Sequence, residues 1–214
     1  MRTALLSLVL LAAAAPARAQ IYHLPRATEP AAWFSFGVGV LRAQTVADGS
    51  TSSTWEFGTG VQWRASLEKS SGNGMSYGLT GTLANMPLQY DGPTCGSCDA
   101  HATMWQALAS LHVGGGNGFH QVIELYAGVV GYGNFRDDAF GGRLPPMGTD
   151  LDPTFGVGYG FGYQTSSHFQ INLVQDYDAS LHQRTNLPGN ASAMQQQYVT
   201  RLGIRLGLGQ RRPY

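Results

Sequence analysis

The sequence predicts an all-β fold: an eight-stranded antiparallel up-and-down transmembrane β-barrel. Three observations support this prediction. Eight segments alternate apolar residues with small or polar ones, the connections between them alternate between long and short, and aromatic residues gather at both ends of the apolar faces. Successive side chains of a β-strand point to opposite faces, so each segment has one continuous apolar face. We expect the barrel to span residues 33–209.

The segment FGVGYGFGYQ (155–164) has the clearest pattern. Its odd positions carry Phe, Val and Tyr, whereas positions 156, 158, 160 and 162 are all glycine. A helix is disfavoured, because each glycine in a helix interior costs about 1 kcal/mol relative to alanine. As a strand, the segment has one large apolar face and one nearly bare face. The glycines either make room for large inward side chains or ease the curvature of a small barrel.

The other segments follow the same rule in chain order. They cover residues 34–41, 54–67, 75–84, 103–113, 119–130, 168–178 and 198–209. In the first, Phe34 and Phe36 lie on the apolar face. In the second, the alternation puts Trp55 and Phe57 on the apolar face and Glu56 on the opposite one.

The connections predict which end of the barrel is which. Long connections are expected at 42–53, 85–101, 132–152 and 179–196, and short ones at 68–74, 114–118 and 165–167. Bacterial outer-membrane barrels have short periplasmic turns and longer extracellular loops. The aromatic residues at both ends of the strands fit the girdles of such barrels at the two membrane interfaces. We therefore expect the apolar face to contact lipid, with four loops outside the cell.

The first residues have the features of an export signal. Arg2 precedes the apolar run ALLSLVLLAAAA, and Ala17-Arg18-Ala19 fits a small-x-small cleavage site. We expect a signal peptide at 1–19, a periplasmic segment at 20–32 and a periplasmic tail at 210–214. The alternative for the first segment is an uncleaved anchor.

The charge composition argues against nucleic acid as a partner. The chain has 13 Lys plus Arg and 13 Asp plus Glu, and Lys69 is its only lysine, so no basic stripe is present. Charged residues make up 12%, about half the usual share of a soluble domain. A soluble lipocalin-like barrel is the competing fold, but it would place its large apolar residues inside.

With this topology, the chain resembles the small eight-stranded outer-membrane barrel families, the OmpA-like transmembrane domain and the opacity-type surface proteins. The resemblance covers 33–209 and rests on the strand pattern. It implies the outer membrane of a Gram-negative-type bacterium, contact with outer-membrane lipid and insertion by the barrel assembly machinery. Such barrels usually close on a strand that ends in an aromatic residue; here Tyr214 keeps the right parity but follows two arginines and a proline in QRRPY.

Charged residues on the small face form the candidate site. They are expected to line the lumen as a polar network of Glu56, Arg64, Glu124, Asp176, Arg201 and Arg205. A buried charge must be paired or hydrated, and an eight-stranded lumen is usually filled by side chains. Asp176 and Arg201 are expected to be close, because one hairpin joins their strands. The network is predicted to be a structural plug; the alternative is a path for ions or small solutes.

Cys95 and Cys98 lie in CGSCDAH, within the second long connection. An exported chain passes an oxidising compartment, so we predict a disulfide that clamps this loop. A thiol oxidoreductase motif would need a helix N-terminus that the segment does not offer. Zinc bound with Asp99 or His101 would lack a complete tetrahedral set. No metal or cofactor is predicted.

An enzymatic role is the third alternative, because some similar barrels modify the acyl chains of lipid A. Ser110 with His112 and Ser180 with His182 are the pairs considered for it. The first pair would lie in the lumen near the short turns, away from outer-leaflet lipid, and the second in a solvated loop. We therefore predict no enzyme. The expected function is a structural or surface-interaction role through four extracellular loops; the alternative is a narrow conduit for small or apolar solutes.

Overall fold

The computed structural model describes residues 29–182 and 194–210, which form ten antiparallel β-strands. The strands are β1 (Ala32–Ala43), β2 (Val46–Asp48), β3 (Ser53–Phe57), β4 (Thr59–Gly72), β5 (Met75–Gly92), β6 (Gly96–Val113), β7 (Gly118–Asp137), β8 (Asp150–Ser166), β9 (Phe169–Leu181) and β10 (Met194–Leu208). The part of the chain described contains no helix long and apolar enough to cross a membrane. The predicted signal peptide, most of the segment at 20–32 and all but the first residue of the tail at 210–214 lie outside the described residues.

Eight of these strands close into a barrel. Each long strand pairs with the next along the chain, and β1 pairs with both β4 and β10, which closes the sheet. β3 continues the line of β4 along β5, and the short β2 pairs with β3. The predicted fold, an all-β eight-stranded antiparallel barrel, is confirmed.

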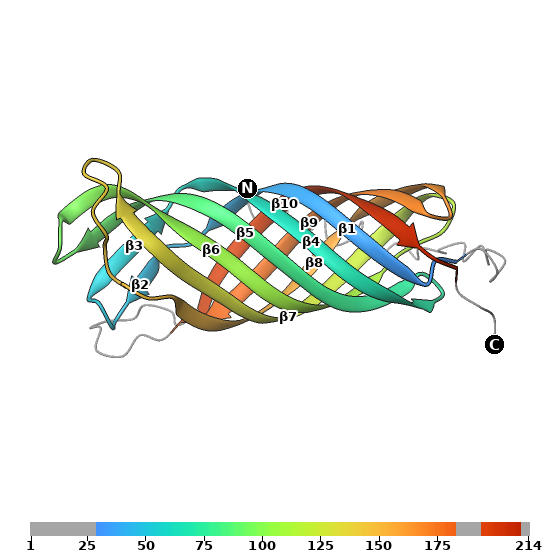
Figure 1. Cartoon of the computed structure of the whole chain (residues 1–214), viewed down its shortest axis with the longest axis horizontal. Helices are drawn as coiled ribbons and strands as arrows, with labels where there is room; N and C mark the ends of the chain where they lie inside the picture. Colours follow the sequence, from blue (N-terminus) through green and yellow to red (C-terminus); the bar gives the residue numbers. More distant parts are fainter. Residues whose placement is uncertain (1–28, 183–193, 211–214) are drawn as a thin grey trace, which may run out of the picture.

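The two ends of the barrel differ in their connections (Figure 1). The short turns after β4, β6 and β8 lie at one end, together with the start of β1 and the end of β10. The opposite end carries β2, β3 and the far ends of β5 and β6, which project beyond their neighbours. We call the first the short-turn end and the second the long-loop end.

The outward face is an apolar belt, as the alternation predicts. Leu79 is 72% exposed, Leu173 54% and Phe155 50%, although all three are large and apolar. Such exposure over a whole barrel would promote aggregation in water but suits hydrocarbon. The belt therefore marks the lipid-facing part of the barrel.

The facing of residues 54–57 differs from the sequence prediction. From Phe57 to Val61 the chain advances four residues while its partner β5 advances three, from Leu88 to Asn85. One extra residue in one strand is a β-bulge, and it reverses which side chains point inward. Trp55 and Phe57 are consequently buried inside the barrel, and Glu56 is exposed outside it.

The second long connection, expected as a loop at 85–101, is mostly strand. β5 and β6 continue pairing to Gly92 and Gly96, so only a tight turn joins them. Along β5, the outward residues change from Leu83 to polar Asn85, while the inward ones change from Thr82 to apolar Ala84 and then Met86. An apolar inside with a polar outside is the arrangement of a barrel in water. We infer that the barrel leaves the bilayer at this level.

Candidate functional site

The lumen of the lipid-facing part is filled by a polar network. Eight buried side chains form it: Arg64, Glu68, His112, Glu124, Tyr126, Asp176, Arg201 and Arg205. They come from five strands, β4, β6, β7, β9 and β10, because the alternation turns every second residue of each strand inward. We call this set the lumen network.

Glu124 is the junction of the lumen network. Its Oε2 lies 2.7 Å from Arg201 Nη2 and 3.1 Å from Arg64 Nη2, and it accepts a 2.8 Å hydrogen bond from the Tyr126 hydroxyl. Its Oε1 lies 3.1 Å from Nδ1 of His112. Every partner is a donor or can act as one, so the buried carboxylate is fully compensated.

Asp176 is the second acceptor of this cluster. Its Oδ2 lies 3.0 Å from Arg201 Nε, the proximity that the hairpin between β9 and β10 predicts. Arg64 Nη1 is 3.6 Å from the same oxygen, and the Arg64 guanidinium lies 4.3 Å above the Tyr126 ring. Two arginines thus balance two carboxylates within one hydrogen-bonded group.

Arg205 forms a separate pair nearer the short-turn end. Its Nη2 donates to Glu68 Oε2 at 2.6 Å and to the Ser76 hydroxyl at 2.7 Å. The guanidinium also lies 4.7 Å above the Trp33 ring. The sequence prediction does not include Glu68, because the second predicted segment ends at Leu67; the same alternation extended by one residue includes it.

The cavity beside the lumen network is small. The cavity beside it, lined by Arg64, Glu124, Arg201 and Arg205 among others, has a volume of about 10 Å³. That is room for one water molecule at most. The geometry is that of a plug.

Two glycines of β8 act in different ways on this packing. A Cβ at Gly158 would collide with the Tyr126 hydroxyl and lie 2.5 Å from Asp176 Oδ1, so this glycine makes room for the lumen network. A Cβ at Gly160 would instead collide with the backbone carbonyl of Leu173 on the neighbouring strand. Gly158 thus fits the first explanation, room for inward side chains, whereas Gly160 permits the close approach of the neighbouring strand's backbone.

Five of the six residues predicted for the lumen lie together there: Arg64, Glu124, Asp176, Arg201 and Arg205. The assignment of Glu56 to the lumen is wrong, because the bulge before Val61 turns its side chain outward.

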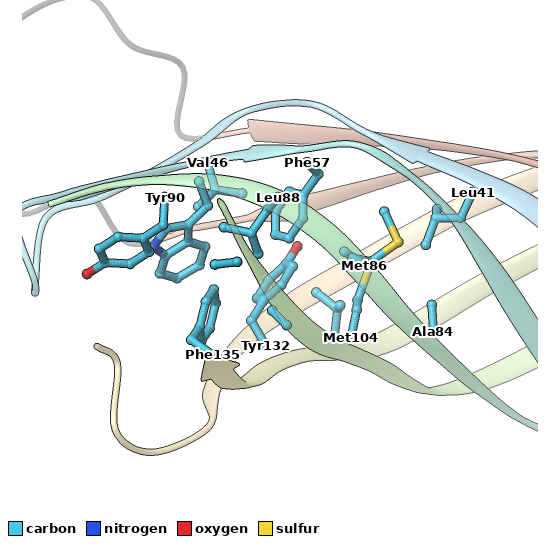
Figure 2. Close-up of a cluster of buried hydrophobic side chains, with 14 of the residues drawn as sticks. Leu41, Val46, Phe57, Ala84, Met86, Leu88, Tyr90, Met104, Tyr132 and Phe135 are labelled. Carbon is cyan, nitrogen blue, oxygen red and sulfur yellow. The ribbon is translucent and has the colours of Figure 1, made fainter. Parts of the chain in front are cut away.

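Above the lumen network, the barrel interior becomes apolar. We call this cluster the mouth core; it consists of Leu41, Val46, Trp55, Phe57, Ala84, Met86, Leu88, Tyr90, Ala100, Ala102, Met104, Val130, Tyr132, Phe135, Leu144 and Val199. Figure 2 shows the labelled members pointing toward one another between the strands. The ring of Trp55 lies 4.5 Å from that of Phe135 and 5.9 Å from that of Tyr132. The mouth core is thus a second seal across the barrel.

Cys95 and Cys98 form the predicted disulfide. It lies at the tip where β5 turns into β6, and both cysteines are partly buried against the mouth core. The disulfide fixes a tight turn of a projecting hairpin. In this disulfide neither cysteine is available as a thiolate ligand for zinc.

The connection from β7 to β8 exposes apolar residues at the long-loop end. Phe140 is 90% exposed and Met147 68%. Met147 also lines a hollow of about 220 Å³, together with Phe135 and Leu144, among others. Neither residue is on the apolar belt, so lipid contact does not explain their exposure.

A cluster of acidic residues surrounds His182 at the same end. Asp152 Oδ2 lies 2.7 Å from Nδ1 of His182, Asp150 Oδ2 lies 3.8 Å from the same nitrogen, and Asp48 Oδ1 lies 3.8 Å from Nε2. Burial lowers the pKa of His182, but the hydrogen bond to Asp152 and the three carboxylates outweigh it and raise the pKa above its ordinary value.

The serine and histidine pairs do not form nucleophile and base. The ring nitrogens of His112 contact Glu124 and the Gly114 carbonyl, whereas the Ser110 hydroxyl accepts a hydrogen bond from Thr80. His182 is bonded to Asp152. A nucleophile needs its base within hydrogen-bond reach, and neither serine has such a contact in the described residues.

Solved structures of other proteins are similar to this chain, and the first of them, with a TM-score above 0.5, supports the fold. No protein-family model and no curated protein matches the chain. Among solved structures, Neisserial surface protein A has a TM-score of 0.51 at 10% identity, covering 83% of this chain and 97% of that one. Ail, the attachment invasion locus protein of Yersinia pestis, has a TM-score of 0.42 at 13% identity, covering 83% and 99%. OprG from Pseudomonas aeruginosa has a TM-score of 0.43 at 14% identity, covering 85% and 96%.

Proposed function

We propose, on the premise that this chain has the fold of the eight-stranded outer-membrane barrels, that it is a sealed barrel of a Gram-negative-type outer membrane. Its role is a structural one or one of surface interaction, exerted through the long-loop end. The barrel assembly machinery would insert the chain into the membrane. The apolar belt would then contact outer-membrane lipid.

The double seal of the interior carries the proposal. The cavity beside the lumen network has room for about one water molecule, and the mouth core packs across the barrel above it. A conduit for ions or small solutes would need an open polar path, and one for apolar solutes would need an unfilled apolar one. Among the described residues, the lumen network lies across the polar path and the mouth core lies across the apolar one.

The shape of the long-loop end supports a contact role. β5 and β6 project as a paired hairpin with a disulfide at its tip, which holds one defined conformation. Next in the chain, the connection after β7 presents Phe140 and Met147 to solvent. Exposed apolar side chains on an ordered support are typical of interaction surfaces.

Labelling of intact cells tests the orientation that the proposal requires. We expect Phe140→Cys to react with a bulky membrane-impermeant maleimide on whole cells. Asn117→Cys, in the short turn between β6 and β7, is the matched control and should react only after the outer membrane is permeabilised. The opposite labelling pattern would mean that the long-loop end faces the periplasm, which would refute the proposal.

The contact role has its own test. Cells producing the Phe140→Ser, Met147→Ser double variant should attach to hydrophobic and protein-coated surfaces less than cells producing equal amounts of the wild-type barrel. Attachment equal to the wild type would leave these two residues without a part in surface contact.

A further inference from the structure

The cluster around His182 lies directly on the mouth core. Asp48 ends β2, Asp150 and Asp152 begin β8, and His182 follows β9. Asp48, Asp152 and His182 are each no more than 3% exposed, whereas the Asp150 side chain is 32% exposed. Segments far apart in the sequence thus bring three carboxylates and one imidazole together, with one side open to solvent.

The imidazole has one nitrogen fixed and one nitrogen unpaired. Nδ1 of His182 is held 2.7 Å from Asp152 Oδ2, which sets the orientation of the ring. Nε2 is buried and has no hydrogen-bond partner among the described residues. An unsatisfied buried nitrogen costs free energy, so its presence calls for a partner that residues 29–182 and 194–210 do not provide.

Nε2 faces a carboxylate across a gap that suits an ion. Asp48 Oδ1 lies 3.8 Å from it, which is too long for a hydrogen bond. A zinc ion bonds both histidine nitrogen and carboxylate oxygen at about 2.0–2.2 Å, so it would occupy such a gap with little adjustment. Asp48, Asp150 and His182 each offer one ligand atom, and these atoms lie within 4.8 Å of one another.

The net negative charge of the cluster also favours a bound cation. In residues 29–182 and 194–210, the ion pairs of Asp48, Asp150 and Asp152 are all with His182, and none is with arginine or lysine. One imidazole does not balance three carboxylates. A divalent cation would supply the missing positive charge.

We propose that Asp48, Asp150 and His182 bind a divalent transition-metal ion of the zinc class, and that Asp152 is a positioning residue. A carboxylate holding the second nitrogen of a histidine ligand is a recurring arrangement around zinc. The histidine favours zinc over calcium or magnesium, which prefer oxygen ligands alone. The ion would join β2, β8 and the end of β9, and would fix the long-loop end of the barrel.

Calorimetry on the purified, refolded chain without a histidine tag tests this proposal. After removal of metal with a chelator, ZnCl₂ should bind saturably at one ion per chain, and CaCl₂ should give no comparable binding. His182→Gln and Asp48→Asn should each weaken zinc binding at least tenfold, and Asp152→Asn about ten- to a hundredfold. His101→Gln is the matched control at the same end, where His101 Nδ1 lies 2.5 Å from Asp138 on the surface; it should bind zinc like the wild type.

Two results would overturn the proposal. One is the absence of saturable zinc binding to the wild type, and the other is wild-type affinity in both His182→Gln and Asp48→Asn. Slower migration on boiling shows in each case that the variant was folded. Should the buried variants fail to fold, Asp150→Asn, whose side chain is partly exposed, takes their place with the same expected loss.

Discussion

Nη2 of Arg201 lies 2.7 Å from Oε2 of Glu124 and joins β10 to β7 through the interior of the barrel. Arg64 reaches the same oxygen from β4, so one carboxylate connects three strands that do not pair with one another. The lumen network therefore acts as an internal brace as well as a plug.

Removing Arg201 should destabilise the barrel strongly. Arg201→Ala leaves Glu124 and Asp176 with less positive charge in a buried site, a change that costs about 3–5 kcal/mol. Denaturant unfolding in lipid vesicles measures the loss. Thr200→Val, on the outward face beside it, should change stability by about 0.5 kcal/mol or less. Equal stability of the two variants would contradict the bracing role.

The cost in stability of a charged substitution on the apolar belt should depend on its depth in the bilayer. Leu173→Arg should cost about 2–4 kcal/mol, and Asn85→Arg, beyond the polarity change on β5, about 0–1 kcal/mol. The same unfolding measurement applies. Wild-type stability of Leu173→Arg would mean that inside and outside are reversed.

Because of the bulge before Val61, substitutions at the adjacent residues Trp55 and Glu56 should have opposite effects on stability: a large loss at Trp55 and almost none at Glu56. Trp55→Ala should cost about 3–5 kcal/mol, because Trp55 lies in the mouth core. Glu56→Ala should change stability by about 0.5 kcal/mol or less, because Glu56 is exposed. A large loss at Glu56 with little loss at Trp55 would support the facing predicted from sequence.

Gly158 should be intolerant of even one methyl group. Gly158→Ala forces the added carbon against the Tyr126 hydroxyl and should cost about 1–3 kcal/mol. Adding Tyr126→Phe removes that hydroxyl, so the double variant should lose less than the sum of the two single losses. Gly142→Ala, where nothing lies within 4 Å of the added carbon, should be neutral. Strict additivity of the first pair would mean that Gly158 serves another purpose.

Most of the barrel could be predicted from sequence because its physics is periodic. Alternation of period two, read outward from 155–164, identifies the strands and places Arg64, Glu124, Asp176, Arg201 and Arg205 inside. Glu56 was misplaced because a bulge depends on how the partner strand pairs, which one strand's own sequence does not reveal.

The long-loop end could not be predicted in the same way. At 85–92 the alternation continues, but the apolar residues now point inward because water has replaced lipid outside. The same alternation therefore places apolar residues on the outward face within the membrane and on the inward face beyond it. The cluster at His182 depends on three connections that only the closed fold brings together.

Planar-bilayer conductance of the refolded barrel tests the sealed interior most directly. Arg205→Ala, which removes one guanidinium from the lumen network, is measured alongside, and each sample is first checked for slower migration on boiling. The sealed barrel predicts that the wild type is silent at all applied voltages. Discrete openings of the wild type, altered in size by Arg205→Ala, would contradict it and would identify the lumen as a conduit with Arg205 in its path.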